Sequence, residues 1–402
     1  MPIVLCFNPG SNSLKFDLIE MKPNAPRASD GTRLLTGVID DIGKETSLEV
    51  FDKKDKILSK KMNGGDFAQA SQYALDALDE LKGRALPCLD AIGLAAVQVV
   101  HGGEVFTHAV RVDDGVLHEI DLRSELAPLH NPNALRVIEV IKQKRPSLPI
   151  FAAFDTAFHH TLPEHAWRYP LEPSLADRYG IRKYGFHGLS HRYLLEQYAH
   201  LSGRTKEEVS IVTMHLESGS SAAAIDHGRS VDTSMGFTPL EGLMMGTRSG
   251  SIDPAIVPFL MKKEELSAEK TLDLLERKSG LLGVSGVSLD TRVLRRREDA
   301  RSRLALEMFG YRVRQTVGAY LAVLGNAQAI VFGGGIGENT PEVRSNVCAG
   351  LTPWGLLLDD NLNRITLKGD SCVSQKQSTL AAWVIHSDEG MQLAFECVLS
   401  SL

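Results

Sequence analysis

The chain has 402 residues, of which 43% are hydrophobic and 23% charged, so it is long enough for two or three domains with apolar cores. This composition excludes a disordered, collagen-like or coiled-coil protein. The formal net charge of -6 argues against a general binder of nucleic acid or anionic membranes. Six arginines lie between Arg292 and Arg303, but Glu298 and Asp299 lie among them, which favours a solvated helix face.

The cysteines and the apolar stretches indicate the compartment. The five cysteines include no Cys-x-x-Cys pair, and they are Cys6, Cys88, Cys348, Cys372 and Cys397. This pattern argues against a disulfide framework or a thiolate zinc site and for a reducing compartment. The N-terminus has no basic segment, so no signal peptide is expected. Residues 316–337 are too interrupted for a membrane span and predict a helix followed by a buried strand. We therefore expect a soluble protein of the cytoplasm.

Strands and helices alternate along the chain. Residues 3–7 form an apolar run and residues 14–21 alternate in polarity, so we expect two strands joined by the polar turn N-P-G-S-N-S. Asp66 is placed to cap a helix with apolar residues at helical spacing. Ser190 is placed to cap a second helix, and Asp388 is placed to cap the last one.

The local architecture repeats half-way along the chain. Residues 209–215 and 222–226 again predict strand, glycine-and-serine turn, strand. The two turns contain Gly10 and Gly219, which are 219 − 10 = 209 residues apart, about half the chain. A repeat at this distance favours two similar domains over a solenoid.

Three glycine clusters could hold an anion. Backbone N–H groups around Gly10, around Gly219 and in G-G-G-I-G-E-N (333–339) are suited to cradling phosphates. A hairpin turn is the alternative for each cluster taken alone. Three in one chain point to a nucleotide or polyphosphate. The sequence has no Walker motif, and residues 333–337 lack the spacing of a Rossmann loop.

Polar residues also stand where buried strands are expected to end. Asp155 follows one apolar run, His187 follows Y-G-F, and Arg248 lies in a segment rich in glycine and methionine. Such positions are typical of sites in open α/β sheets, although a capped helix or a paired core residue is the alternative for each. His187 and His191 have metal-ligand spacing, but no glutamate lies between them and no third ligand is evident, which argues against zinc.

Taken together, these residues resemble the acetate kinase (acetokinase) family, which includes propionate kinases, of the actin/hexokinase-like superfamily. The resemblance covers almost the whole chain. Its landmarks are N-P-G-S-N-S-L-K-F, V-H-G-G-E, A-P-L-H-N-P, F-D-T-A-F-H, Y-G-F-H-G, S-V-D-T-S-M-G-F-T-P-L-E-G-L-M-M-G-T-R-S-G, S-G-L-L-G-V-S-G and G-G-G-I-G-E-N.

The resemblance implies an α/β fold with two duplicated actin/hexokinase-like (ribonuclease H-like) domains and a nucleotide cleft between them. The N-terminal domain would span residues 1–155 and be completed by a C-terminal helix at about 389–402. The C-terminal nucleotide-binding domain would span residues 156–388.

The resemblance also implies roles for single residues. The catalytic residues would be Asp155, His187 and Arg248. Mg²⁺ (or Mn²⁺) would be linked to Asn8 and Glu389. The residues at the carboxylate substrate would be Gln98 and the apolar acyl pocket Val100, Leu129, Phe186 and Pro239. The residues at ATP or ADP would be Asn8, Ser11, Ser13, Lys15, His215, Gly219, Asp290, Arg292, Gly335, Ile336 and Asn339.

The implied activity is reversible, ATP-dependent phosphorylation of a short-chain carboxylate, in which acetate and ATP give acetyl phosphate and ADP by direct in-line transfer. The implied partners are a small carboxylate and ATP, in a cytoplasmic homodimer that binds neither nucleic acid nor membrane. Two alternatives stay open. The chain could bind nucleotide or phosphate with little kinase activity, or it could act on another small acid such as propionate.

Three departures from the family pattern affect these expectations. Val97 and Gln98 stand where the family has a histidine and a catalytic arginine, and Gln98 is expected to limit turnover. Glu217 and Ser218 stand in the phosphate turn where the family has glycine and asparagine. Gly390 replaces an acidic residue that often follows the metal-linked glutamate.

Overall fold

The computed structural model describes residues 2–81, 91–365 and 369–402, which fold into two compact units. Unit 1 extends to Phe158 and includes Asp388–Leu402, and unit 2 is His159–Ser387. The sequence placed the first boundary after Asp155. Cys88 lies outside the described residues, and the four described cysteines are free thiols.

Unit 1 is built on an eight-stranded sheet of order β5-β4-β3-β2-β1-β6-β8-β7. Its strands are β1 (Ile3–Pro9), β2 (Leu14–Glu20), β3 (Thr32–Asp40), β4 (Glu45–Asp52), β5 (Asp55–Asn63), β6 (Ile92–Val99), β7 (Val110–Arg111) and β8 (Ile150–Phe154). Its helices are α1 (Phe67–Glu80), α2 (Asp114–Leu122), α3 (Asn131–Lys144) and α15 (Glu389–Ser401). Among these strands of the described residues, β1, β6 and β8 run parallel to one another, and the other pairings are antiparallel.

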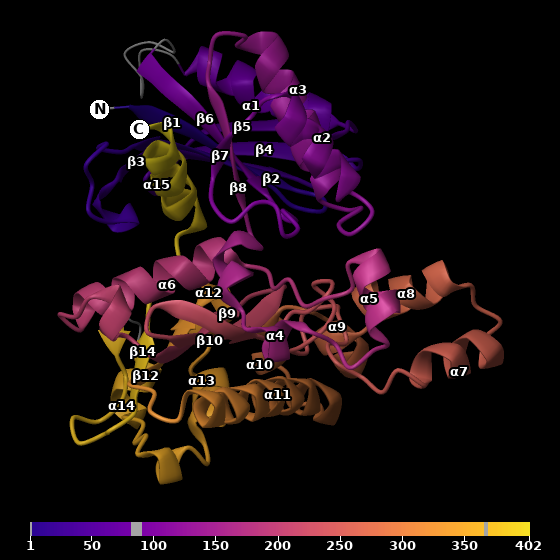
Figure 1. Cartoon of the computed structure of the whole chain (residues 1–402), viewed down its shortest axis with the longest axis vertical. Helices are drawn as coiled ribbons and strands as arrows, with labels where there is room; N and C mark the ends of the chain where they lie inside the picture. The colour runs from indigo at the N-terminus through magenta and orange to yellow at the C-terminus, as the bar shows by residue number, and fades with distance from the viewer. Residues whose placement is uncertain (1, 82–90, 366–368) are drawn as a thin grey trace. The chain divides into compact units, whose positions relative to one another are not determined.

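The alternation of side chains along β1 divides the core of unit 1 between two layers of helices. Leu5 and Phe7 pack into the large apolar cluster that α1 and α3 complete. Cys6 faces the other way, and its thiol lies 3.7 Å from the Gly390 carbonyl at the start of α15. Figure 1 shows α15 in yellow against this sheet. A helix from the far end of the chain therefore completes the unit that the N-terminus begins.

Unit 2 is built on a six-stranded sheet of order β11-β10-β9-β12-β14-β13. Its strands are β9 (Ile211–Leu216), β10 (Ser220–Asp226), β11 (Arg229–Thr233), β12 (Ala329–Gly333), β13 (Ser371–Cys372) and β14 (Ala381–Val384). Its helices are α4 (Glu164–Trp167), α5 (Pro173–Tyr179), α6 (Gly188–Leu201), α7 (Ile256–Lys263), α8 (Ala268–Arg277), α9 (Gly280–Ser285), α10 (Thr291–Arg295), α11 (Ala300–Leu324), α12 (Gly334–Asn339), α13 (Pro341–Cys348) and α14 (Asp360–Arg364).

Two long helices of unit 2 cover opposite faces of its sheet (Figure 1). On one face, Phe309 and Val313 of α11 join the apolar cluster of β9, β10 and β12. On the other face α6 lies so close to β12 that a Cβ at Gly333 would stand 2.8 Å from Leu194. This close approach explains why a glycine ends the strand.

The two sheets repeat one pattern, which confirms the duplication expected from the sequence. In unit 1, β3, β2 and β1 are antiparallel neighbours, and β6 and β8 then follow in parallel to β1. In unit 2, β11, β10 and β9 are antiparallel neighbours, and β12 and β14 then follow in parallel to β9. The two glycine turns occupy the equivalent β1–β2 and β9–β10 connections.

Two of the three predicted helix caps are confirmed. Asp66 accepts from the Gln69 N–H and Asp388 accepts from the Met391 N–H, so both begin helices as expected. The prediction for Ser190 was wrong, because α6 begins at Gly188 and its N-cap residue is His187, three residues before Ser190. The Ser190 hydroxyl instead contacts Nδ1 of His215, which leaves it no capping role.

The arginine run forms the end of α10, a turn and the start of α11 rather than one helix, and its arginines are exposed as expected. Residues 316–337 form the end of α11, then β12 and most of α12, so the predicted helix and buried strand are confirmed. In the part of the chain that the structure describes, no helix combines the length and the apolar character needed to cross a membrane.

Candidate active site

The carboxyl ends of the parallel strands gather polar side chains in unit 1. Gln98 lies near the end of β6 and Asp155 follows β8, so the two meet at one edge of the sheet. The Gln98 amide donates to Oδ1 of Asp155 at 2.8 Å, and both side chains are buried. Asn8, at the end of β1, places its amide nitrogen 3.4 Å from Oε2 of Glu389. The structure thus brings four of the predicted residues together as two pairs.

Negative charge accumulates around Asp155. Burial raises the pKa of its carboxyl group well above the usual range, and the charges of Glu389 and Glu396 raise it further. The hydrogen bond from Gln98 acts in the opposite direction but supplies no positive charge. A cation bound here would therefore stabilise the ionised form of these carboxyl groups.

The first glycine turn is the β1–β2 hairpin. The Gly10 N–H already donates to the Ser13 carbonyl at 2.8 Å, so it is engaged within the turn. Ser11 is exposed and Ser13 is half-buried in the same turn. Lys15 is paired directly with Asn8 across the strands, so both point to the face of the sheet that α15 covers.

The four predicted acyl-pocket residues divide between the units. Val100 is half-buried and Leu129 is 39% exposed in unit 1. In unit 2, Phe186 is fully buried and Pro239 is half-buried. The backbone carbonyls of both unit 2 residues accept hydrogen bonds from side chains: Phe186 accepts from His159, and Pro239 accepts from Arg248.

His187 and Arg248 converge on the turn between β9 and β10. A Cβ at Gly219 would lie 3.5 Å from Nε2 of His187 and 3.6 Å from Nη1 of Arg248. Glycine therefore keeps open a space that two nitrogen donors border. His187 itself has the left-handed φ of 58° at the start of α6, a conformation that costs a non-glycine residue free energy and that clusters at functional sites.

The surroundings of His187 favour the neutral form of its ring. Burial lowers its pKa well below the usual range, and the neighbouring His215, His191 and Arg248 lower it further. The His187 and His215 rings lie 4.3 Å apart, centroid to centroid. A neutral imidazole can still donate one N–H, so His187 and Arg248 offer one neutral and one charged donor at the same turn.

A cavity of about 670 Å³ in unit 2 is lined by all five residues predicted to contact the nucleotide beyond the phosphate turn. These residues are Asp290, Arg292, Gly335, Ile336 and Asn339. Glu217 and Ser218, which the sequence analysis placed in the phosphate turn without assigning them a contact to the nucleotide, line the same cavity. Glu217 accepts from the Gly335 N–H at 3.1 Å, because the parallel strands β9 and β12 end side by side.

Sequence reasoning missed the clamp that holds this glycine segment. Arg344 is fully buried, and its guanidinium donates to the carbonyls of Gly337 and Glu338 at 2.9 and 2.8 Å. The Asn363 side chain accepts from the same guanidinium at 2.7 Å. An isolated arginine in a helix gives no sequence signal for such a role.

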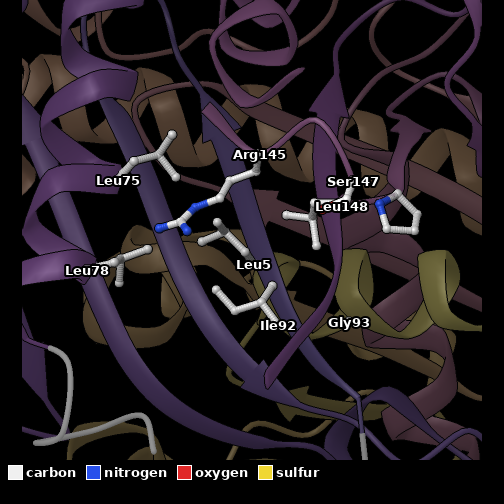
Figure 2. Close-up of a pocket in the computed structure, with 9 residues that line it drawn as sticks. Leu5, Leu75, Leu78, Ile92, Gly93, Arg145, Ser147 and Leu148 are labelled. Atoms are coloured by element: carbon white, nitrogen blue, oxygen red, sulfur yellow. The ribbon is translucent and has the colours of Figure 1, made fainter. Parts of the chain in front are cut away.

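A second cavity, of about 290 Å³, lies in unit 1 and contains none of the predicted site residues. Figure 2 shows the Arg145 guanidinium among Leu5, Leu75 and Leu78. Asp79 accepts from this guanidinium at 2.6 Å, so its charge is already paired.

Two buried histidines, His101 and His159, are expected to make stability depend on pH. Burial lowers the pKa of His101 to about 3 and that of His159 to about 4, from an ordinary value of 6.5. Between these values the unfolded chain binds protons that the folded protein does not, so the free energy of unfolding falls as the pH falls below 6.5. At pH 5 each histidine is expected to cost about 2 kcal/mol relative to pH 8.

Calorimetric Tm values between pH 8 and pH 5 test this expectation. His159→Gln should reduce the fall in Tm between pH 8 and pH 5, whereas His227→Gln, at an exposed position, should leave it unchanged. A wild-type Tm that is constant over this range would contradict the assignment.

Comparisons with known proteins identify the family of the chain. The family model described as "Acetokinase family" matches residues 3–395. The chain is 42% identical to the acetate kinase of Thermoanaerobacterium thermosaccharolyticum over 395 residues, which cover 97% of each protein. It superimposes with a TM-score of 0.92 at 34% identity on the crystal structure of Porphyromonas gingivalis acetate kinase, covering 100% of both chains. A propionate kinase from Francisella tularensis gives a TM-score of 0.90 at 34% identity, covering 98% of this chain and 99% of the other.

Proposed function

The chain belongs to the acetokinase family, and on that premise we propose that it transfers the terminal phosphoryl group of ATP to a short-chain carboxylate. With acetate, the carboxylate oxygen forms a bond to phosphorus as the bond to the ADP oxygen breaks, and the products are acetyl phosphate and ADP. The reverse reaction uses the same groups. The observation that carries the proposal is the convergence of His187 and Arg248 on the space beside Gly219.

The chemistry of this transfer suits the groups present. A carboxylate is ionised at neutral pH, since its pKa is about 4, so it needs no general base. The task is to bring two anions together and to stabilise charge on the transferring phosphoryl group. Arg248 and the neutral His187 supply donors for that charge, and a guanidinium suits the oxygens of a phosphoryl group better than an ammonium does. Asp155 then orients other groups rather than accepting a proton.

We assign Mg²⁺ to unit 1, with Asn8 and Glu389 as the residues that hold it. Two observations support a divalent cation there: the amide and carboxylate of these residues offer oxygen ligands, and negative charge accumulates around Asp155. When bound, Mg²⁺ would neutralise phosphate charge. That the protein is a homodimer of the cytoplasm is proposed from the family resemblance alone. Sedimentation velocity tests whether it is a dimer.

The acid substrate is expected to be small. Val100, Leu129, Phe186 and Pro239 are the proposed walls of the acyl pocket, and each is bulky or rigid. One extra methylene in such a pocket changes binding by about 1–3 kcal/mol. Trapping acyl phosphate with hydroxylamine should therefore give higher kcat/KM for acetate and propionate than for butyrate and valerate. The highest kcat/KM on valerate would overturn the assignment of these walls.

The same assay decides between a kinase and a binding protein without turnover. The second candidate is favoured by one observation, the carboxylate of Glu217 on the Gly335 N–H in the proposed nucleotide cavity. Acyl phosphate formed from any acid of two to five carbons establishes the kinase. Calorimetric binding of ADP with no acyl phosphate from any of these acids would establish the binding protein.

A further inference from the structure

The histidines of α6 lie over two strands whose polar residues share one face of the sheet. His187 is the N-cap residue of α6 and His191 lies in its first turn, and both rings contact Ser221. Thr213 and His215 alternate along β9, and Ser221 is paired directly with His215 across the hairpin. The fold therefore places the rings of His187 and His191 against the hydroxyl groups of Ser221 and Thr213. His191, Ser221 and Thr213 are buried, and His187 is half-buried.

These side chains form one hydrogen-bonded chain. The Ser221 Oγ lies 2.9 Å from Nδ1 of His187 and 2.9 Å from Nε2 of His191. The other nitrogen of His191, Nδ1, lies 2.8 Å from Oγ1 of Thr213. A hydroxyl group has one proton, so Ser221 can donate to only one of the two rings and must accept from the other if it donates to the first. The protonation of the two rings is thereby coupled.

We propose that Ser221, supported by His191 and Thr213, is a positioning residue that keeps the proton of His187 on Nε2, the nitrogen beside Gly219. This proposal rests on the proposed function, because phosphoryl oxygens only accept hydrogen bonds. A neutral imidazole has one N–H, so a ring that donates from Nε2 must accept at Nδ1. Ser221 then donates to His187, accepts from Nε2–H of His191, and leaves Nδ1 of His191 to accept from Thr213.

The arrangement differs from that of the neighbouring His159. Nε2 of His159 lies 3.1 Å from the Phe186 carbonyl, which can only accept, so that ring has a fixed tautomer whatever Ser230 does. No backbone carbonyl fixes His187 in this way among the hydrogen bonds of the described residues. Its tautomer depends on the side-chain hydroxyl of Ser221 and on the ring beyond it.

Ser221→Ala tests the proposal with little change in volume. We expect kcat for acyl phosphate formation to fall about fivefold to tenfold, with KM for ATP and for the acid within twofold of wild type. The reason is that the ring stays in place at the start of α6, while only part of the population has the proton on Nε2. Ser221→Thr keeps the hydroxyl and should restore kcat. Thr213→Val, which removes the last hydroxyl, should have a smaller effect in the same direction.

Nitrogen NMR of the full chain labelled in its histidine rings reads the tautomer directly, with His187→Gln to assign the signal. Wild type should show His187 protonated on Nε2, and Ser221→Ala should show a mixture of both tautomers. Ser190→Ala is the matched control, because it removes a hydroxyl that contacts His215 instead and should leave the His187 signal unchanged.

Two results would overturn the proposal: wild-type His187 protonated on Nδ1, or Ser221→Ala and Thr213→Val that both leave the His187 tautomer unchanged. Failure of the proposed function is distinguishable from either result. In that case no acid yields acyl phosphate, while the tautomer is still measured in the absence of turnover.

Discussion

Gln98→Arg is expected to raise kcat/KM for acetate at least tenfold. Gln98 stands where the family resemblance expects an arginine, and its amide donates to the buried Asp155. The carboxyl groups of Glu389 and Glu396 raise the pKa of Asp155, and the hydrogen bond that Gln98 donates to Asp155 comes from a neutral amide rather than a cation. Loss of one charged contact to a transition state commonly costs about 3 kcal/mol, so restoring such a contact can recover a substantial part of that.

The structure also predicts that Gln98→Arg removes an unfavourable contribution to stability. The Gln98 carbonyl oxygen, Oε1, is buried without a hydrogen-bond partner among the described residues. A buried acceptor without a partner is unfavourable by about 1–3 kcal/mol, and arginine has no acceptor to leave unpaired. The guanidinium should also lower the pKa of Asp155, because it places a positive charge beside that carboxyl group.

The companion residue Val97 should be left unchanged. Family resemblance expects a histidine there, but the Val97 side chain lies in the apolar core of unit 1. Val97→His would bury an imidazole among aliphatic side chains and would confound activity with stability. Gln98→Met is the better control, since it keeps the size and neutrality of the side chain but loses the hydrogen bond to Asp155. If Gln98→Arg melts at the wild-type Tm and acetate turnover is unchanged, the charge-deficit explanation is wrong.

Local patterns predicted much of the fold because each depended on near neighbours. The alternation of residues 14–21, the Asp66 cap and the repeat of strand, turn and strand all describe contacts within one element or one hairpin. The Ser190 prediction failed because the left-handed His187 starts α6 earlier, and a single sequence does not reveal that a non-glycine residue adopts this conformation.

Contacts between distant elements were the ones that sequence patterns could not supply. The hydrogen bonds that link His187, Ser221, His191 and Thr213 join one helix to two strands. The alternation of Thr213 and His215 and the hairpin register of Ser221 were a usable sequence signal for them. Arg344 gave no signal at all. The family resemblance indicated Asp290 and Gly335 as nucleotide-binding residues, and they are 335 − 290 = 45 residues apart in the sequence. The fold brings them to the lining of one cavity.

Removing the charge of Glu217 is expected to tighten ADP and ATP binding about thirtyfold. Glu217 Oε1 accepts from the Gly335 N–H at 3.1 Å, and both residues line the proposed nucleotide cavity. An anion fixed within the protein thus occupies a backbone donor that a phosphate group would otherwise use. At an effective dielectric constant of about 20, two unit charges about 8 Å apart repel each other by about 2 kcal/mol, which corresponds to roughly thirtyfold in Kd.

Isothermal titration of Glu217→Gln with ADP, ATP and adenosine in the presence of Mg²⁺ separates charge from shape. Adenosine has no phosphate, so its Kd should be unchanged while those of ADP and ATP fall. Glu269→Gln, at an exposed position on α8, alters the net charge equally and should change none of the three. Tighter adenosine binding by the same factor would mean that the variant reshapes the cavity. Unchanged ADP binding would mean that Glu217 leaves Gly335 whenever nucleotide enters, and any slow turnover would then be explained by Gln98.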